Sequence, residues 1–170
     1  SMGVKAVFSD LDGTLVHFPA WFEEYGSKIV RRDPDKQTAT VRSPDGEERA
    51  CRLLPSSTMG DGLVSERTVE LIDELRSLGV LFVVVTAARK STLLERLPLL
   101  PAVDAAVGET GSRIYVDGVL DSAWADGLRP VCGPLEREMP AEERPEVLWR
   151  WLRRLQQVPG LKVDGRSYYG

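Results

Sequence analysis

The stretch VKAVFSDLDGT, residues 4–14, combines a short apolar run with two closely spaced acids. An apolar run that ends in a polar loop, as this one does at Ser9, is typical of a strand buried on both faces of a parallel sheet. Asp10 and Asp12 are separated by one residue, so an extended backbone puts both carboxylates on the same side. Gly13 allows a sharp turn after them and exposes backbone N–H groups to an anion. The stretch therefore predicts a polar site at the carboxyl end of a buried strand.

A second apolar run, residues 81–85, is rich in β-branched side chains and predicts another buried strand. Apolar residues recur at helical spacing over residues 71–78 just before it. Ser65 is placed to cap the start of this helix, and Gly79 to end it. A helix, a short turn and a buried strand form half of a βαβ unit. We therefore expect an α/β fold with a Rossmann-like core of parallel strands.

Residues 15–60 form a long insertion between the first strand and this helix. Turn sequences at residues 33–35 and 43–46 divide the insertion into short strands. We expect these strands at residues 28–31, 37–42 and 48–53. The pattern predicts an antiparallel β flap above the sheet, and long ordered insertions of this kind are usually functional or regulatory.

The rest of the chain continues the alternation of helices and strands. We expect a helix at residues 91–97, a strand at 103–107, a hairpin of 113–116 with 119–120, a linker at 130–145, a helix at 142–157 and a strand from Leu161. In the last helix, Leu148, Trp151, Leu152 and Leu155 form the expected apolar face.

Composition limits the classes of function. The chain has 170 residues, of which 42% are hydrophobic and 28% charged, as in an ordinary soluble globular protein. Its net charge of −4 argues against nucleic acid or an anionic membrane as the main partner. Cys51 and Cys132 lie far apart without metal-ligand spacing, and the chain starts with no signal segment. We therefore expect reduced cysteines and a cytoplasmic protein.

Two carboxylates as close as those of Asp10 and Asp12 repel each other unless a cation lies between them. A hard cation with oxygen ligands meets this need, and Mg²⁺ is the natural choice. The alternative is a turn whose acids only cap and solvate the loop. The strand, the spacing and a hydroxyl residue at the end of the neighbouring strand, Thr86, favour the functional interpretation.

The sequence DLDGT at residues 10–14, behind an apolar strand, resembles the first motif of the haloacid dehalogenase-like (HAD) superfamily, most of whose members are phosphatases. The resemblance implies that Asp10 attacks phosphorus and becomes an aspartyl-phosphate. It implies that Asp12 protonates the leaving oxygen and then activates water. The Asp10 carboxylate and the Asp12 main-chain carbonyl bind Mg²⁺ in this scheme, and Gly13 and Thr14 belong to the phosphate-binding loop.

Thr86 resembles the second motif of the superfamily, a Thr or Ser that ends an apolar strand. The resemblance implies that the Thr86 hydroxyl and the backbone N–H of Ala87 hold a phosphoryl oxygen. Arg89 is a candidate phosphate contact or, equally, a surface arginine at the start of a helix. Residues 86–115 resemble the branch with large α/β caps, which includes Cof-type and sucrose-phosphate phosphatases.

This resemblance implies a HAD-like core over residues 3–132 and the start of an α/β cap over residues 133–170. Full members also have a lysine that steadies the aspartyl-phosphate and an acidic cluster that completes the metal shell, both after the cap. No residue of this chain matches either feature, so the chain resembles a member truncated inside its cap.

The expected function is a Mg²⁺-dependent phosphohydrolase of a small phosphorylated metabolite, a sugar phosphate being the first choice. One alternative is a phosphomutase or phosphotransferase, in which an acceptor hydroxyl replaces water. Another is a catalytically incomplete module that binds a phosphorylated ligand or a partner protein. An unpaired strand in a partial cap would also allow a homo-oligomer.

Several other residues have plainer interpretations. His17, the only histidine, is expected to be structural, and Trp149 and Trp151 to pack the last helix. Tyr168 and Tyr169 are candidates for lining a sugar pocket. For Glu109 and Arg113 we expect a salt bridge.

Overall fold

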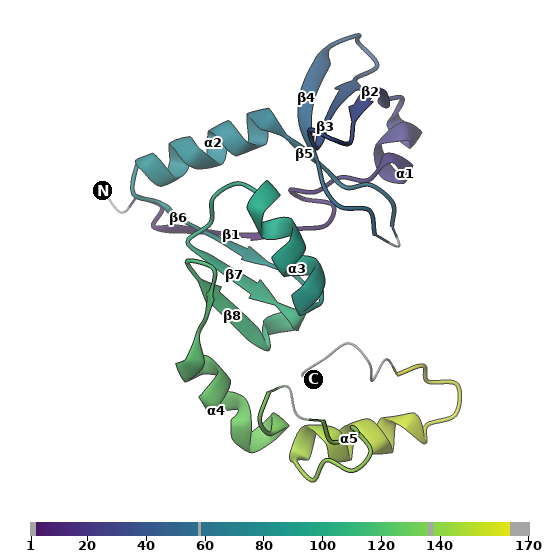
Figure 1. Ribbon diagram of the computed structural model, residues 1–170, viewed down its shortest axis with the longest axis vertical. Coiled ribbons are helices and arrows are strands. Elements are labelled where there is room, and N and C mark those ends of the chain that lie inside the picture. Colours follow the sequence, from purple (N-terminus) through teal and green to yellow (C-terminus); the bar gives the residue numbers. More distant parts are fainter. Residues whose placement is uncertain (1–2, 58, 136–137, 164–170) are drawn as a thin grey trace.

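The computed structural model describes residues 3–57, 59–135 and 138–163, and both apolar runs lie in its first sheet. This sheet has the strand order β1-β6-β7-β8-β9 (Figure 1). Its strands are β1 (Ala6–Asp10), β6 (Leu81–Val85), β7 (Ala105–Gly108), β8 (Arg113–Val116) and β9 (Val119–Leu120). β1, β6 and β7 are parallel, whereas β8 pairs antiparallel with both of its neighbours, β7 and β9. The chain is therefore a mixed α/β protein with an open sheet, and the strands predicted for this sheet are confirmed.

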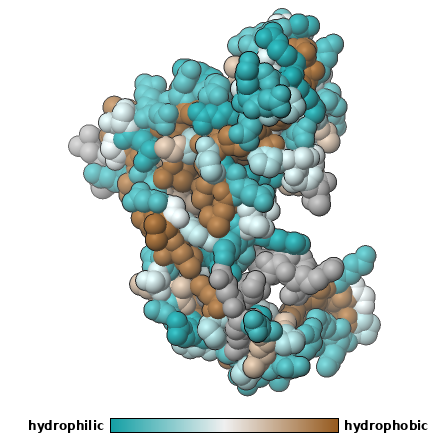
Figure 2. Space-filling model, in the orientation of Figure 1, coloured by the Kyte–Doolittle hydropathy of each residue, from teal (hydrophilic) through white to brown (hydrophobic). Residues whose placement is uncertain are grey.

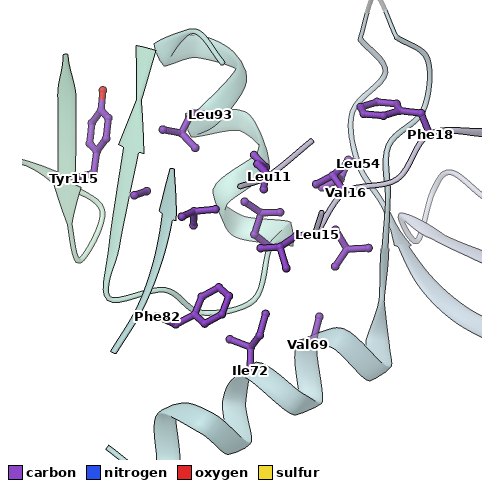
Figure 3. Packing of buried hydrophobic residues seen from close by; sticks show 14 residues of the cluster. Leu11, Leu15, Val16, Phe18, Leu54, Val69, Ile72, Phe82, Leu93 and Tyr115 are labelled. Atoms are coloured by element: carbon purple, nitrogen blue, oxygen red, sulfur yellow. The ribbon is translucent and has the colours of Figure 1, made fainter. Parts of the chain in front are cut away.

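Helix α2 (Glu66–Ser77) begins where its capping residue predicts. The Ser65 hydroxyl accepts a hydrogen bond from the Arg67 amide at 3.2 Å, and Gly79 takes the left-handed conformation that ends the helix, with φ of 80°. The helix packs its Val69 and Ile72 against Phe82 of β6 (Figure 3). Leu93 of α3 (Lys90–Arg96) belongs to the same buried cluster, so both helices contribute to one core.

One face of the first sheet is open. Phe82 and Val84 are buried, whereas the alternating residues Leu81 and Val85 are exposed, and Phe8 of the paired strand is 72% exposed. The prediction of a strand buried on both faces is therefore wrong for β1 and β6. The reason is that the buried side chains of α2 and α3 pack against only one face of these strands, the face that carries Phe82. Figure 2 shows the face of the molecule seen in Figure 1 as mostly hydrophilic, with hydrophobic residues in a band over the strands of this sheet.

The insertion folds as a second, antiparallel sheet. Its strands are β2 (Lys28–Asp33), β3 (Thr38–Arg42), β4 (Glu48–Leu53) and β5 (Leu63–Ser65), preceded by α1 (Pro19–Phe22) and the short helix η1 (Glu23–Tyr25). The three predicted strands are confirmed, whereas the sequence missed β5, which is only three residues long. Arg52 ties this sheet to the core, because its guanidinium donates to Glu66 at 3.0 Å and to the carbonyls of Leu99 and Leu100 at 3.3 Å.

The last described part contains α4 (Ser122–Cys132) and α5 (Val147–Gln156). Helix α4 was not predicted, and its last residues fall in the stretch expected to be a linker, 130–145. Asp121 caps the helix by accepting a hydrogen bond from the Trp124 amide at 3.0 Å. The two helices meet where the Trp149 indole donates to the Cys132 carbonyl at 2.7 Å.

The predicted packing of α5 is only partly right. Trp149 is buried as expected, whereas Trp151 is 55% exposed and Leu155 is exposed too, so the expected apolar face is not the buried one. No strand begins at Leu161 within residues 161–163. Tyr168 and Tyr169 lie outside the described residues.

Both cysteines are free and buried, in agreement with the expectation that they are reduced. Burial raises the pKa of the Cys51 thiol to about 11. Within the described ranges, no helix has the length and apolar character needed to cross a membrane.

The two faces of the first sheet provide a matched test of the core. Phe82→Ala, which empties a position that is 3% exposed, should lower the free energy of unfolding by about 3–5 kcal/mol. Phe8→Ala, on the open face of the neighbouring strand, should change it by no more than about 0.5 kcal/mol. Urea unfolding of both variants measures the difference. Similar losses at the two positions would show that the Phe8 face is covered in solution.

A pH dependence follows from Asp104, at the start of the turn into β7. Arg76 donates to both of its carboxylate oxygens, at 3.1 and 2.9 Å, and with the Phe82 amide it lowers the pKa of Asp104 to about 2 from 3.8. A lowered pKa stabilises the fold above the unfolded value of 3.8, and this gain disappears as the pH falls through about 2. Asp104→Asn should therefore be less stable than the wild type at neutral pH and converge with it near pH 2, as followed by thermal unfolding. A constant difference across this range would contradict the assignment.

Candidate functional site

The register of β1 and β6 places the ends of the two strands side by side. Asp10 pairs with Val85, so Thr86 follows at the same edge of the sheet, where open α/β sheets form their sites. A groove of about 380 Å³ opens at this edge. Its lining residues are Phe8, Ser9, Asp10, Val85, Thr86, Ala87, Thr110 and Gly111. The structure thus brings three predicted site residues, Asp10, Thr86 and Ala87, into one groove.

The Asp10 carboxylate has no partner within the described residues. Asp10 is exposed, its side chain takes part in no described hydrogen bond or ion pair, and its backbone carbonyl accepts from the Ser9 hydroxyl at 2.9 Å. A carboxylate that is free, accessible and beside a groove can act as a nucleophile or as a metal ligand.

Thr86 and Ala87 offer donors to an anion in the same groove. The Thr86 side chain is buried, and its hydroxyl oxygen accepts from the Ala88 amide at 3.0 Å, a local bond that fixes the loop after β6. The hydroxyl hydrogen itself donates to no described residue, and neither does the Ala87 amide. Both can therefore donate to one bound oxygen atom, as the resemblance implies.

The turn after β7, the short helix η3 (Glu109–Gly111), forms the opposite wall and has a strained backbone. Glu109 and Thr110 have φ of 49° and 57°, in the left-handed region that residues other than glycine seldom occupy. The Thr110 amide donates to the Thr86 carbonyl at 3.2 Å, and the Glu109 amide to the Ala88 carbonyl at 3.0 Å. These bonds hold the turn against the loop after β6, and they are the kind of surroundings that maintain strain at a functional site.

A buried ion pair supports this turn. The Glu109 carboxylate accepts from Arg113 Nε at 2.8 Å and from the Lys90 amide at 3.0 Å, so it fixes both the turn and the start of α3. The predicted salt bridge between Glu109 and Arg113 is confirmed. It lies in the interior, with both side chains nearly inaccessible.

Gly13 and Thr14 lie apart from the groove. The Gly13 amide donates to the Val16 carbonyl at 2.7 Å and the Thr14 amide to the Leu11 carbonyl at 3.3 Å, so both amides close the loop on itself. The expectation that the Gly13 amide is open to an anion is therefore wrong for this structure. Gly13 is still required, because its φ is 87° and the Trp21 ring lies 3.4 Å from where a Cβ would be.

Asp12 faces a partner that the sequence analysis did not name. Its Oδ1 accepts from Arg96 Nη1 at 2.8 Å, and it is not among the residues that line the groove beside Asp10. The expected placement of both carboxylates on one side does not apply, since β1 ends at Asp10 and Asp12 lies in the following turn. One signal for Arg96 was present in the sequence, because it occupies an apolar position of the helical pattern that contains the buried Leu93 and Leu100.

Two further candidate residues occupy peripheral positions. Arg89 is exposed immediately before α3, and it is not among the groove residues. His17 pairs through its backbone with Leu63, at 2.9 Å in both directions.

A metal site built only from protein side chains brings several ligands together at one point. Among residues 3–57, 59–135 and 138–163, no three His, Cys, Asp or Glu side chains come together as a metal site. Mg²⁺ commonly takes only one or two carboxylates, with water and substrate phosphate completing the shell. The accessible Asp10 carboxylate is one ligand available to such a sparse site.

No family model matches this chain, and no curated protein matches it.

The strained turn gives a stability prediction. Thr110→Gly should raise the free energy of unfolding by about 0.5–1 kcal/mol, because glycine adopts a positive φ without steric cost. Thr38→Gly, an exposed position in the strand β3, should instead lower it by about 1 kcal/mol. Urea unfolding compares the two variants. A loss of stability at position 110 as large as that at position 38 would show that the turn is not strained.

Proposed function

We propose that this chain is the Rossmann-like core of a HAD-like, Mg²⁺-dependent phosphohydrolase, with its flap insertion and the start of a cap. It acts on a small phosphorylated metabolite through an aspartyl-phosphate at Asp10. The observation that carries this proposal is the free Asp10 carboxylate in a groove that also contains the Thr86 hydroxyl and the unused Ala87 amide.

The reaction has two displacements at phosphorus. An Asp10 oxygen attacks the phosphorus of a phosphate ester while the bond to the ester oxygen breaks, and the departing oxygen takes up a proton from the Asp12 carboxyl group. Water then loses a proton to the Asp12 carboxylate and attacks the phosphorus of the aspartyl-phosphate, which releases inorganic phosphate and restores both Asp10 and the protonated Asp12. Thr86 and Ala87 donate to the phosphoryl oxygens during both steps. When bound at Asp10 and the Asp12 carbonyl, Mg²⁺ neutralises charge on the phosphoryl group.

The size and lining of the groove favour a small substrate. Its volume of about 380 Å³ is near the lower end of known small-molecule sites. Phe8 and Val85 give it an apolar wall next to the acid, and the resemblance to sugar-phosphate phosphatases makes a sugar phosphate the first choice. Two buried free cysteines suit a reducing, cytoplasmic setting for this activity.

A second candidate function is a module that binds a phosphorylated ligand without turnover. It is favoured by the Asp12 carboxylate, one oxygen of which is already held by Arg96. It is also favoured by the lack of a three-acid cluster within the described residues. In such a module the groove would hold the phosphate, and Asp10 would only take part in binding a cation.

The first experiment is a phosphate-release assay of the purified chain with Mg²⁺ and p-nitrophenyl phosphate. The wild type should release phosphate, and the rate of release by Asp10→Asn should be lower by more than about a thousandfold, because the nucleophile is gone. Asp35→Asn, an exposed acid in the flap turn, is the matched control and should keep the wild-type rate.

Binding of a phosphoryl mimic separates the two candidates. If the wild type shows no turnover but binds trifluoroberyllate only with Mg²⁺ and only with Asp10 intact, the binding module is supported. If there is neither turnover nor binding, both candidates are wrong.

A further inference from the structure

Arg96 is among the most deeply buried charged side chains of the described chain. Its side chain is 2% exposed, and its guanidinium lies 5.8 Å from the centre of the Phe18 ring. Nη1 donates to Asp12 Oδ1 at 2.8 Å, whereas Nη2 is buried and has no hydrogen-bond partner among the described residues. The guanidinium is thus enclosed by the core, by the insertion and by the loop after β1.

Stability alone is a weak reason for such an arrangement. A buried ion pair seldom stabilises a protein more than apolar residues of the same size, because both charges lose their hydration. The unpartnered Nη2 adds a further cost. An apolar residue at position 96 would continue the buried stripe of Leu93 and Leu100, so the arginine is better explained by what it does to Asp12.

The pair restrains Asp12 in a specific way. One carboxylate oxygen is anchored on the buried guanidinium, while Oδ2 accepts no hydrogen bond from the described residues. The Asp12 side chain remains 24% exposed, so the free oxygen can meet solvent or a ligand. Phe18 also supports Trp21, whose ring lies against Gly13, and this contact further limits movement of the loop.

We propose that Arg96 is a positioning residue that sets the orientation of the Asp12 carboxylate for proton transfer. The proposal rests on the proposed function, because Asp12 has the acid/base role only in that reaction. Arg96 itself touches neither the substrate nor the phosphoryl group. A group held in the correct orientation gains most of its catalytic effect from that placement.

The test is a double-mutant cycle in the full chain, with p-nitrophenyl phosphate and Mg²⁺. Arg96→Gln should lower kcat by about 10- to 100-fold with KM within about threefold, as expected for a misplaced acid/base group. Arg96→Lys, which keeps the charge, should recover part of the loss. In the Asp12→Asn background, Arg96→Gln should lower kcat by less than about threefold, because residues that act as a unit are not additive.

Arg76→Gln is the matched control, since it breaks an arginine–aspartate pair whose members do not line the groove, and it should keep the wild-type kcat. Thermal unfolding identifies variants that fail to fold. If Arg96→Gln does not fold, Arg96→Lys takes its place in the double-mutant cycle. The proposal is overturned if the two losses multiply independently, or if Arg96→Gln leaves kcat unchanged or raises it.

A spectroscopic readout separates failure of this proposal from failure of the proposed function. In ¹⁵N spectra of arginine side chains, Asp12→Asn should shift the Arg96 signals, whereas Asp126→Asn, the partner of Arg129, should not. No shift would overturn the pair itself. An inactive wild type in which Asp12→Asn still shifts the Arg96 signal would overturn the catalytic role of the pair together with the proposed function. Only the existence of the Arg96–Asp12 ion pair would then stand.

Discussion

The parallel pairing of β1 with β6 is the constraint on which the rest of the site depends. Because Asp10 pairs with Val85, the acid and the hydroxyl of Thr86 reach the same edge of the sheet, although 76 positions separate their numbers in the sequence. The register is fixed by the buried Phe82 and Val84, since a slip by one residue would turn them toward solvent. The loop after β7 is then bonded to the loop after β6, which closes the groove on its far side.

Much of this arrangement could be predicted from the sequence, because local patterns determine it. The apolar runs predicted β1 and β6, Ser65 predicted the start of α2, and the turn residues divided the insertion into its strands. What could not be predicted depends on distant contacts. No local pattern says which side of β1 the helices cover, and α4 contains Gly127 and Pro130, which ordinarily interrupt helices.

The candidate site shows the same division. Asp10, Thr86 and Ala87 were predicted because the ends of two apolar strands resemble known motifs, and the structure brings these residues together. The placement of Asp12 was not predicted, because it depends on Arg96, which lies 84 positions away in the sequence, at the end of α3. The strained turn at Thr110 was also missed as part of the site, since a left-handed threonine has no recognisable sequence pattern.

The central claim is that phosphorus becomes bonded to Asp10. The most direct measurement is borohydride reduction of the chain during turnover, followed by mass spectrometry of residues 6–28, because the reductant converts an aspartyl-phosphate into homoserine. The account predicts homoserine at position 10 when substrate and Mg²⁺ are present, and none when Mg²⁺ is left out. Phosphate release with an unmodified Asp10, or with homoserine at position 12 instead, would contradict it.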